Sequence, residues 1–268
     1  MKISFSTLSC PDWSWDRILT EASRLGFDGI EIRGVEGEMY LPSAKPFLEA
    51  NLEGTLAQLA STGLEVVGLG SSVCFHDPES HGEFLAEGKA YLDLAVRMGV
   101  PYVRVFGDRI PDPAHRIETV ERISEGFRAL CDHAMGTPVE LLFETHGDFN
   151  DAESVLSVLD RVDRPNLGIL WDIEHTFKFY GDDVTGFLER TRNRIRHVHV
   201  KDVRRTHEGF TACRVGEGDV PVARIVRLLD GIGYEGYLSL EWEKKWHPEL
   251  EEPEFVLPAY IETMRYLS

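Results

Sequence analysis

Near its middle the chain reads Val139-Glu140-Leu141-Leu142-Phe143-Glu144-Thr145-His146, an apolar run that ends in polar residues. A second stretch, His197-Val198-His199-Val200-Lys201-Asp202, has the same character. Apolar and β-branched residues in succession are typical of strands that are buried on both faces of a parallel sheet. Both stretches therefore predict parallel strands with polar residues at or near their last positions.

Similar apolar runs recur on both sides of these two stretches, and amphipathic segments separate them. In the segment 15–25, for example, Ile18, Leu19 and Ala22 have the spacing of a helix face that packs on a sheet. Strand and helix alternate throughout with short connections, which predicts a closed (β/α)₈ barrel. The predicted strands are 2–9, 29–33, 65–71, 102–106, 139–144, 167–172, 195–201 and 237–242. The predicted helices are 15–25, 52–59, 84–98, 117–134, 152–159, 184–194, 221–229 and 255–267.

The length supports one α/β domain over residues 1–268. A closed barrel of this class typically needs about 250 residues, and the chain has 268 without a linker or a low-complexity tract. The alternative is a doubly wound open sheet. Such a sheet usually has a glycine-rich phosphate turn after its first strand, and the stretch Ser6-Thr7-Leu8-Ser9-Cys10 is not one.

Net charge and cysteine spacing limit the classes of partner and the cellular compartment that we expect for the protein. A formal net charge of -18 repels nucleic acid and anionic membranes, so neither is expected as a partner. The four cysteines are far apart and form no C-x-x-C pair, which predicts reduced thiols and a cytoplasmic protein. We find no signal-peptide pattern and no apolar stretch of the roughly 18 residues that span a bilayer. Whether the chain forms a homo-oligomer is left open.

Four polar residues lie at the ends of successive predicted strands: Glu144, Asp172, His199 and Glu241. Strand ends of a barrel meet at one rim, which is where such folds build their sites. Three converging carboxylates would repel one another unless a cation lies between them. Three oxygen ligands and one imidazole suit Mn²⁺ first, or Mg²⁺ or Co²⁺. The alternative is that each residue is an isolated strand-end group or an ion-pair partner.

The same motifs carry a resemblance that extends over essentially the whole chain. The sequence resembles the xylose-isomerase-like TIM-barrel superfamily of sugar phosphate isomerases and epimerases, which includes ketose 3-epimerases, hydroxypyruvate isomerases and inosose dehydratases. As a set, the motifs indicate the superfamily and say little about the substrate. They are Glu144-Thr145-His146, Asp172-Ile173-Glu174-His175, the run from His197 to Asp202, Glu241, Gly26-Phe27-Asp28-Gly29-Ile30-Glu31 and Val215-Gly216-Glu217-Gly218-Asp219.

This resemblance implies roles for individual residues. It implies that one divalent metal ion is bound by Glu144, Asp172, His199 and Glu241, and that Glu144 and Glu241 are also the acid/base pair. It implies substrate contacts for His175 and Arg205. The pocket floor is expected to include Glu31, His76, His146 and Lys201, for which a buried hydrogen-bonded role is the alternative.

The implied reaction is proton transfer next to a carbonyl of a sugar or polyol, through an enediolate, as in an isomerase or epimerase. The first alternative is a lyase on a keto-polyol or 3-oxo-sugar, such as an inosose dehydratase or a 3-oxo-glycoside lyase. More remote alternatives are an abasic-site endonuclease and a non-catalytic sugar-binding barrel. The endonucleases of this superfamily need a multi-zinc cluster, whose complete ligand set we do not find in the sequence.

Overall fold

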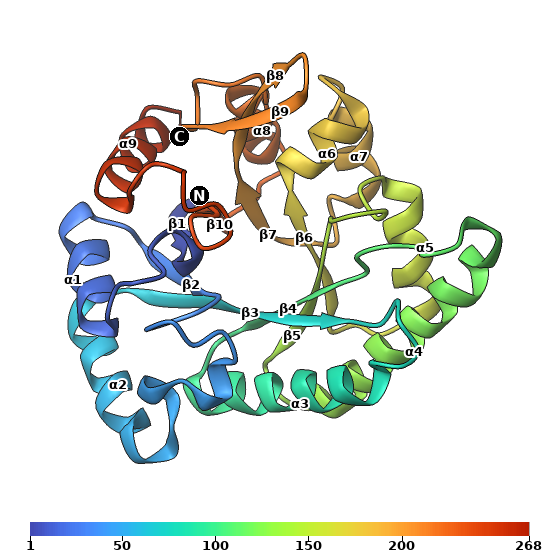
Figure 1. Cartoon of the computed structure of the whole chain (residues 1–268), viewed down its shortest axis with the longest axis horizontal. Helices are drawn as coiled ribbons and strands as arrows, with labels where there is room; N and C mark the ends of the chain where they lie inside the picture. The colour runs from blue at the N-terminus through green and yellow to red at the C-terminus, as the bar shows by residue number, and fades with distance from the viewer. Residues whose placement is uncertain (268) are drawn as a thin grey trace. The chain divides into compact units, whose positions relative to one another are not determined.

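Short parallel strands alternate with helices along the chain in the computed structural model, which describes residues 1–267 (Figure 1). The predicted strands are confirmed with small changes at their ends. Their apolar runs are buried as expected, and every residue of β6 (Leu167–Asp172) is inaccessible to solvent. The other predicted strands are β1 (Lys2–Ser6), β2 (Gly29–Ile32), β3 (Glu65–Cys74), β4 (Tyr102–Phe106), β5 (Glu140–Glu144), β7 (Ile195–Val200) and β10 (Tyr237–Leu240).

The helix α1 (Trp15–Leu25) begins and ends at ordinary capping residues. The Ser14 side chain accepts a hydrogen bond from the Arg17 N–H, and Gly26 closes the helix with a left-handed φ of 79°. None of the helices within residues 1–267 is long and apolar enough to cross a membrane. The remaining helices are α2 (Glu49–Thr62), α3 (His81–Met98), α4 (Arg116–Ala134), α5 (Ala152–Val162), α6 (Ile173–Tyr180), α7 (Thr185–Thr191), α8 (Val222–Gly231) and α9 (Pro253–Leu267).

One unit of the structure comprises Met1–Val67 and the described residues from Val198 onward. Its parallel strands lie in the order β2, β1, β10, β7. The register pairs Ser4 with Gly29 on one side and with Ser239 on the other, and Ser239 pairs with His199. Because all four strands run in the same direction, their carboxyl ends share one edge.

The second unit is Gly68–His197. Its strands lie in the order β3, β4, β5, β6, also parallel, and Glu144 pairs with Phe106 of β4 and Leu170 of β6. The helices α3, α4 and α5 flank these strands in Figure 1. The boundaries between the units fall within β3 and β7 and not in a linker. A single domain over residues 1–268 stays a prediction.

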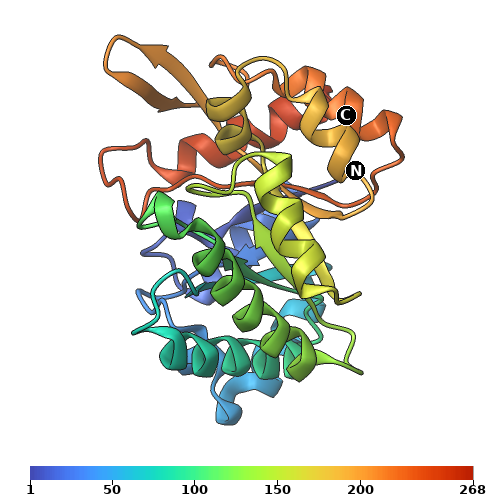
Figure 2. The same cartoon turned by 90° about the vertical axis from the view of Figure 1, so that its right-hand side faces the viewer.

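The sequence prediction lacks a two-stranded hairpin and one helix. β8 (Asp202–Thr206) and β9 (Gly209–Cys213) form an antiparallel hairpin, which projects from its unit in Figure 2. The sequence did not indicate it because most of its side chains are exposed, so it has no apolar face. The helix α6 starts directly after β6, where Asp172 caps it. In the sequence, Asp172 is recognisable as the end of a strand but not as the cap of a helix.

Candidate active site

In the second unit, Glu144 and Asp172 end the neighbouring strands β5 and β6. Both side chains are buried, with 1% and 0% exposure. The hydroxyl of Thr145 links the two strand ends, since it accepts a hydrogen bond from the Asp172 N–H at 2.8 Å and donates one to the Asp172 carbonyl at 3.2 Å. The predicted placement of these two carboxylates at adjacent strand ends is therefore what the structure has.

Glu144 has a cationic partner that the sequence analysis missed. Nη1 of Arg104, on β4, donates to Oε2 of Glu144 at 2.7 Å, and both side chains are at least nine-tenths buried. A buried carboxylate is costly unless it is paired, and a guanidinium is always charged. Arg104 therefore holds Glu144 as a carboxylate. The available signal was a charged residue in the middle of the apolar strand Tyr102–Phe106.

Asp172 is oriented by the backbone of the helix that follows it. Its Oδ1 accepts hydrogen bonds from the N–H groups of Glu174 at 2.9 Å and His175 at 3.1 Å, as an N-cap does. His175 thus lies in the first turn of α6, and its ring contacts that of His146 with centroids 4.7 Å apart. Asp172, Glu174 and His175 form one of the groups in this unit that could hold a metal ion.

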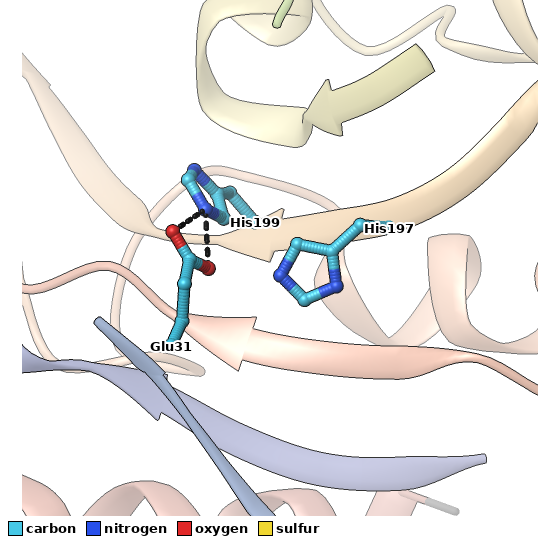
Figure 3. A group of neighbouring side chains, drawn as sticks. All are labelled: Glu31, His197 and His199. Carbon is cyan, nitrogen blue, oxygen red and sulfur yellow. Dashed lines mark hydrogen bonds and ion pairs between the residues drawn. The ribbon is translucent and has the colours of Figure 1, made fainter. Parts of the chain in front are cut away.

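In the first unit, His199 is fully buried and lies between two carboxylates. Its Nε2 is 2.8 Å and 3.0 Å from the two oxygens of Glu31, on β2, and its Nδ1 is 3.2 Å from Oε2 of Glu241. Figure 3 shows the Glu31 carboxylate facing His199, with His197 two residues earlier on the same strand. The Ser239 hydroxyl also donates to Glu31 at 3.2 Å. Glu31, expected on the pocket floor, holds the His199 ring in place.

Lys201 contacts the second predicted acid/base residue. Its Nζ lies 2.6 Å from Oε2 of Glu241 and 3.1 Å from Oε1 of Glu243. Glu241 is 4% exposed, so its charge is balanced by this ammonium group. The contact gives Lys201 a partner within the protein, and its predicted role toward substrate stays a prediction.

Arg205 lies on the exposed hairpin β8–β9, where its backbone N–H donates to Asp219 at 2.7 Å. The loop beside it is organised by Asp202, whose carboxylate accepts from the N–H groups of Gly216, Gly218 and Val220. Burial raises the pKa of the Asp202 carboxyl, and these backbone hydrogen bonds oppose the rise. The segment 215–219 of the sequence motif is therefore a fixed loop, whereas the substrate role of Arg205 stays a prediction.

His76 and His146 follow β3 and β5 and share a partner, Asp108, which the sequence analysis did not consider. Nδ1 of His146 is 3.3 Å from Oδ1 of Asp108, and Nδ1 of His76 is 3.6 Å from its Oδ2. His146 holds the pKa of the Asp108 carboxyl below its usual range. Both histidines thus lie at the strand-end edge of the second unit, as predicted.

The donor chemistry of the two units suits a divalent cation. The second unit contributes two buried carboxylates that are already ionised or oriented, Glu144 and Asp172. The first unit contributes the imidazole of His199. Its Nε2 contacts Glu31, so its Nδ1 faces Glu241. An ordered imidazole with a carboxylate on its other nitrogen is the usual arrangement of a metal-binding histidine. The donors in each unit therefore have the chemistry of metal ligands.

The chain is similar to known enzymes in sequence and to a solved structure in fold. Fructoselysine 3-epimerase of Escherichia coli O157:H7 is 24% identical over 256 residues, which cover 92% of this chain and 91% of that protein. An inosose dehydratase of Geobacillus thermodenitrificans (strain NG80-2) is 24% identical over 278 residues, 92% of this chain and 87% of that protein. The crystal structure of the IOLI protein with a zinc atom has a TM-score of 0.80 at 20% identity, over 100% of this chain and 98% of that one.

A family model described as xylose isomerase-like TIM barrel matches residues 19–266. That match covers nearly the whole chain, and the sequence relatives named above are enzymes that act on sugars or polyols. The predicted (β/α)₈ fold class is thereby confirmed. The chain belongs to the xylose isomerase-like TIM barrel family.

Proposed function

We propose that the protein is a metal-dependent sugar isomerase or epimerase that moves a proton at the carbon next to a carbonyl. One observation carries this proposal. Each predicted acid/base glutamate is buried at a strand end with a cation beside it, Arg104 at 2.7 Å from Glu144 and Lys201 at 2.6 Å from Glu241. A buried carboxylate that is kept ionised in this way can act as a base. Binding alone does not require two such groups.

In this proposal the metal ion is bound by Glu144 and Asp172 of the second unit and by His199 and Glu241 of the first. The family's barrel supports this assignment, because its strand ends meet at one rim. Mn²⁺ is the first candidate, with Mg²⁺ or Co²⁺ as alternatives, and the zinc in the related IOLI structure adds a fourth. When bound, the ion would polarise the substrate carbonyl and lower the energy of the enediolate.

The proton steps belong to the chain's own residues. Glu144 removes the α-proton, because Arg104 keeps it charged and cannot itself give up a proton. Glu241 passes a proton from the neighbouring Lys201 to the carbon; Lys201 then regains a proton from solvent, and Glu144 releases the α-proton to solvent. Return to the opposite face of the same carbon inverts it, which is epimerisation. Return to the adjacent carbon is aldose–ketose isomerisation.

The second candidate is a lyase on a keto-polyol or 3-oxo-sugar, which the dehydratase relative favours. The same first proton transfer would then be followed by loss of a β-hydroxyl. The imidazoles of His146 and His175, which meet edge to face with centroids 4.7 Å apart, offer an acid for that leaving group.

The proposed substrate is a small sugar or polyol. The residues proposed to bind it are His175, Arg205, His146, Lys201, His76 and Glu31. Glu31 also contacts His199.

The test is to load the enzyme with Mn²⁺ in D₂O and offer ketoses, keto-inositols and 3-oxo-glycosides, with the products followed by NMR. An isomerase or epimerase introduces deuterium beside the carbonyl, and its product has lost no water. A lyase eliminates water from the substrate and yields an unsaturated or rearranged product. Chelation should abolish either activity. Turnover that continues after complete metal removal would refute the metal dependence, and turnover of no member by metal-loaded enzyme would refute the substrate class.

A further inference from the structure

A second cluster of metal-binding side chains lies in the unit Gly68–His197, beside the residues assigned above. Cys74 is the last residue of β3, His76 follows two positions later, and Asp108 lies two positions beyond the end of β4. Their ligand atoms all lie within 4.8 Å of one another. The cluster combines one sulfur, one nitrogen and one oxygen donor. It contains neither Glu144 nor Asp172.

The separation between Asp108 and His76 is that of groups that share an ion. Oδ2 of Asp108 is 3.6 Å from Nδ1 of His76, which is longer than a direct hydrogen bond of about 2.7–3.2 Å, whereas its Oδ1 faces His146 at 3.3 Å. Two ligands of a tetrahedral zinc ion, each about 2.1 Å from the metal, lie about 3.4 Å apart. Nδ1 of His76 is buried and makes no hydrogen bond within residues 1–267.

The backbone presents Asp108 in a fixed orientation. Asp108 has a φ of 60°, which a non-glycine residue adopts only when its surroundings enforce it. Its carbonyl accepts the Asp148 N–H at 2.7 Å, and the Asp148 carboxylate accepts the Ile110 N–H at 2.7 Å. A side chain at Gly147 would collide with that same carbonyl. The loops after β4 and β5 therefore hold each other and aim the carboxylate toward the histidines.

We propose that Cys74, His76 and Asp108 bind a divalent ion of the zinc type, separately from the site that contains Glu144. Thiolate, imidazole and carboxylate are the three donor classes that zinc takes in proteins, and three protein ligands leave a fourth position for water or a small molecule. Binding converts the Cys74 thiol to a thiolate and releases its proton to solvent. His146, on the other oxygen of Asp108, holds the carboxylate in place. This proposal does not depend on the proposed catalytic function.

Cobalt titration tests the proposal without an activity assay. Co²⁺ bound by a thiolate gives a sulfur-to-metal charge-transfer band in the near ultraviolet, and the site of Glu144, Asp172, His199 and Glu241 has no sulfur. We expect the purified metal-free protein to develop this band when Co²⁺ is added and to lose it when Zn²⁺ displaces the cobalt. Cys74→Ser should abolish the band, and His76→Gln should weaken Co²⁺ affinity at the band by at least about 10-fold.

Two further variants keep the result decisive. Cys213→Ser removes a partly exposed cysteine on β9, outside the cluster, and should leave the band unchanged. Glu144→Gln should also leave it unchanged, so failure of the catalytic proposal is distinguishable from failure of this one. Circular dichroism confirms that each variant is folded. Absence of the band with excess Co²⁺, or its survival in folded Cys74→Ser, overturns the proposal.

Discussion

Glu144 and Glu241 are both buried strand-end glutamates, but they differ in the cation that each contacts. Glu144 faces an arginine that is 5% exposed, whereas Glu241 faces a lysine that is 11% exposed and has a second carboxylate partner, Glu243. A guanidinium cannot exchange protons near neutral pH, but an ammonium group can. The difference indicates a carboxylate beside a fixed positive charge in one unit and a carboxylate beside an exchangeable proton in the other.

The same contrast extends to the proposed ligands next to them. Asp172 is oriented by two backbone N–H groups at the start of α6. His199 is oriented by the side chain of Glu31. The first unit is therefore more sensitive to a single substitution away from the reacting atoms, and the second is more sensitive to loss of its buried arginine.

The largest effect is expected from Arg104→Met, which leaves the Glu144 carboxylate buried without its cation. We predict a loss of about 3–5 kcal/mol in the free energy of unfolding, measured by urea denaturation. Lys201→Met should cost less, because Glu241 keeps His199 beside it at 3.2 Å. Arg104→Lys serves as the control that retains a charge. Equal losses in the two methionine variants would remove the contrast between the two glutamates.

Next in size are Glu144→Gln and Glu241→Gln, which keep the shape and remove the base. Each should fold and lose at least about 10²-fold in kcat. If Glu144 is the first base, Glu241→Gln still exchanges the α-proton of one epimer with D₂O, as NMR would record, but does not invert the carbon. Glu243→Gln is a matched control, because it also contacts Lys201 but is 35% exposed. Near-normal turnover in both variants with metal bound would place the acid/base pair elsewhere.

The smallest effect is expected from Glu31→Gln, which weakens the orientation of His199 without touching the other ligands. Mn²⁺ affinity measured by calorimetry should fall by about 10- to 100-fold, the usual range for the partner of a metal-binding histidine. Ser239→Ala removes only the 3.2 Å hydrogen bond to Glu31 and should cost less. Unchanged affinity in Glu31→Gln would show that the strand alone positions the His199 ring.

The candidate ligands could be found from sequence because each is the polar end of an apolar run. Glu144 after Leu141-Leu142-Phe143 is an example, and its strand β5 lies where that pattern predicted. Hydrophobic periodicity is a local signal, so it reports strands, helices and the residues at their ends. Hydrophobic periodicity did not indicate the hairpin β8–β9, because both of its strands are largely exposed.

The spacing of apolar residues along the sequence was enough to predict the barrel class, its eight parallel strands, and which acidic and histidine residues stand at strand ends. The partners of these residues became evident only in the folded structure: Arg104 on Glu144, Glu31 on His199, and Asp108 between His76 and His146. Each of these contacts joins residues on different strands or loops that are 32 or more positions apart in the sequence. A pair of that kind is set by parallel register and loop packing, which leave no periodic trace in the sequence.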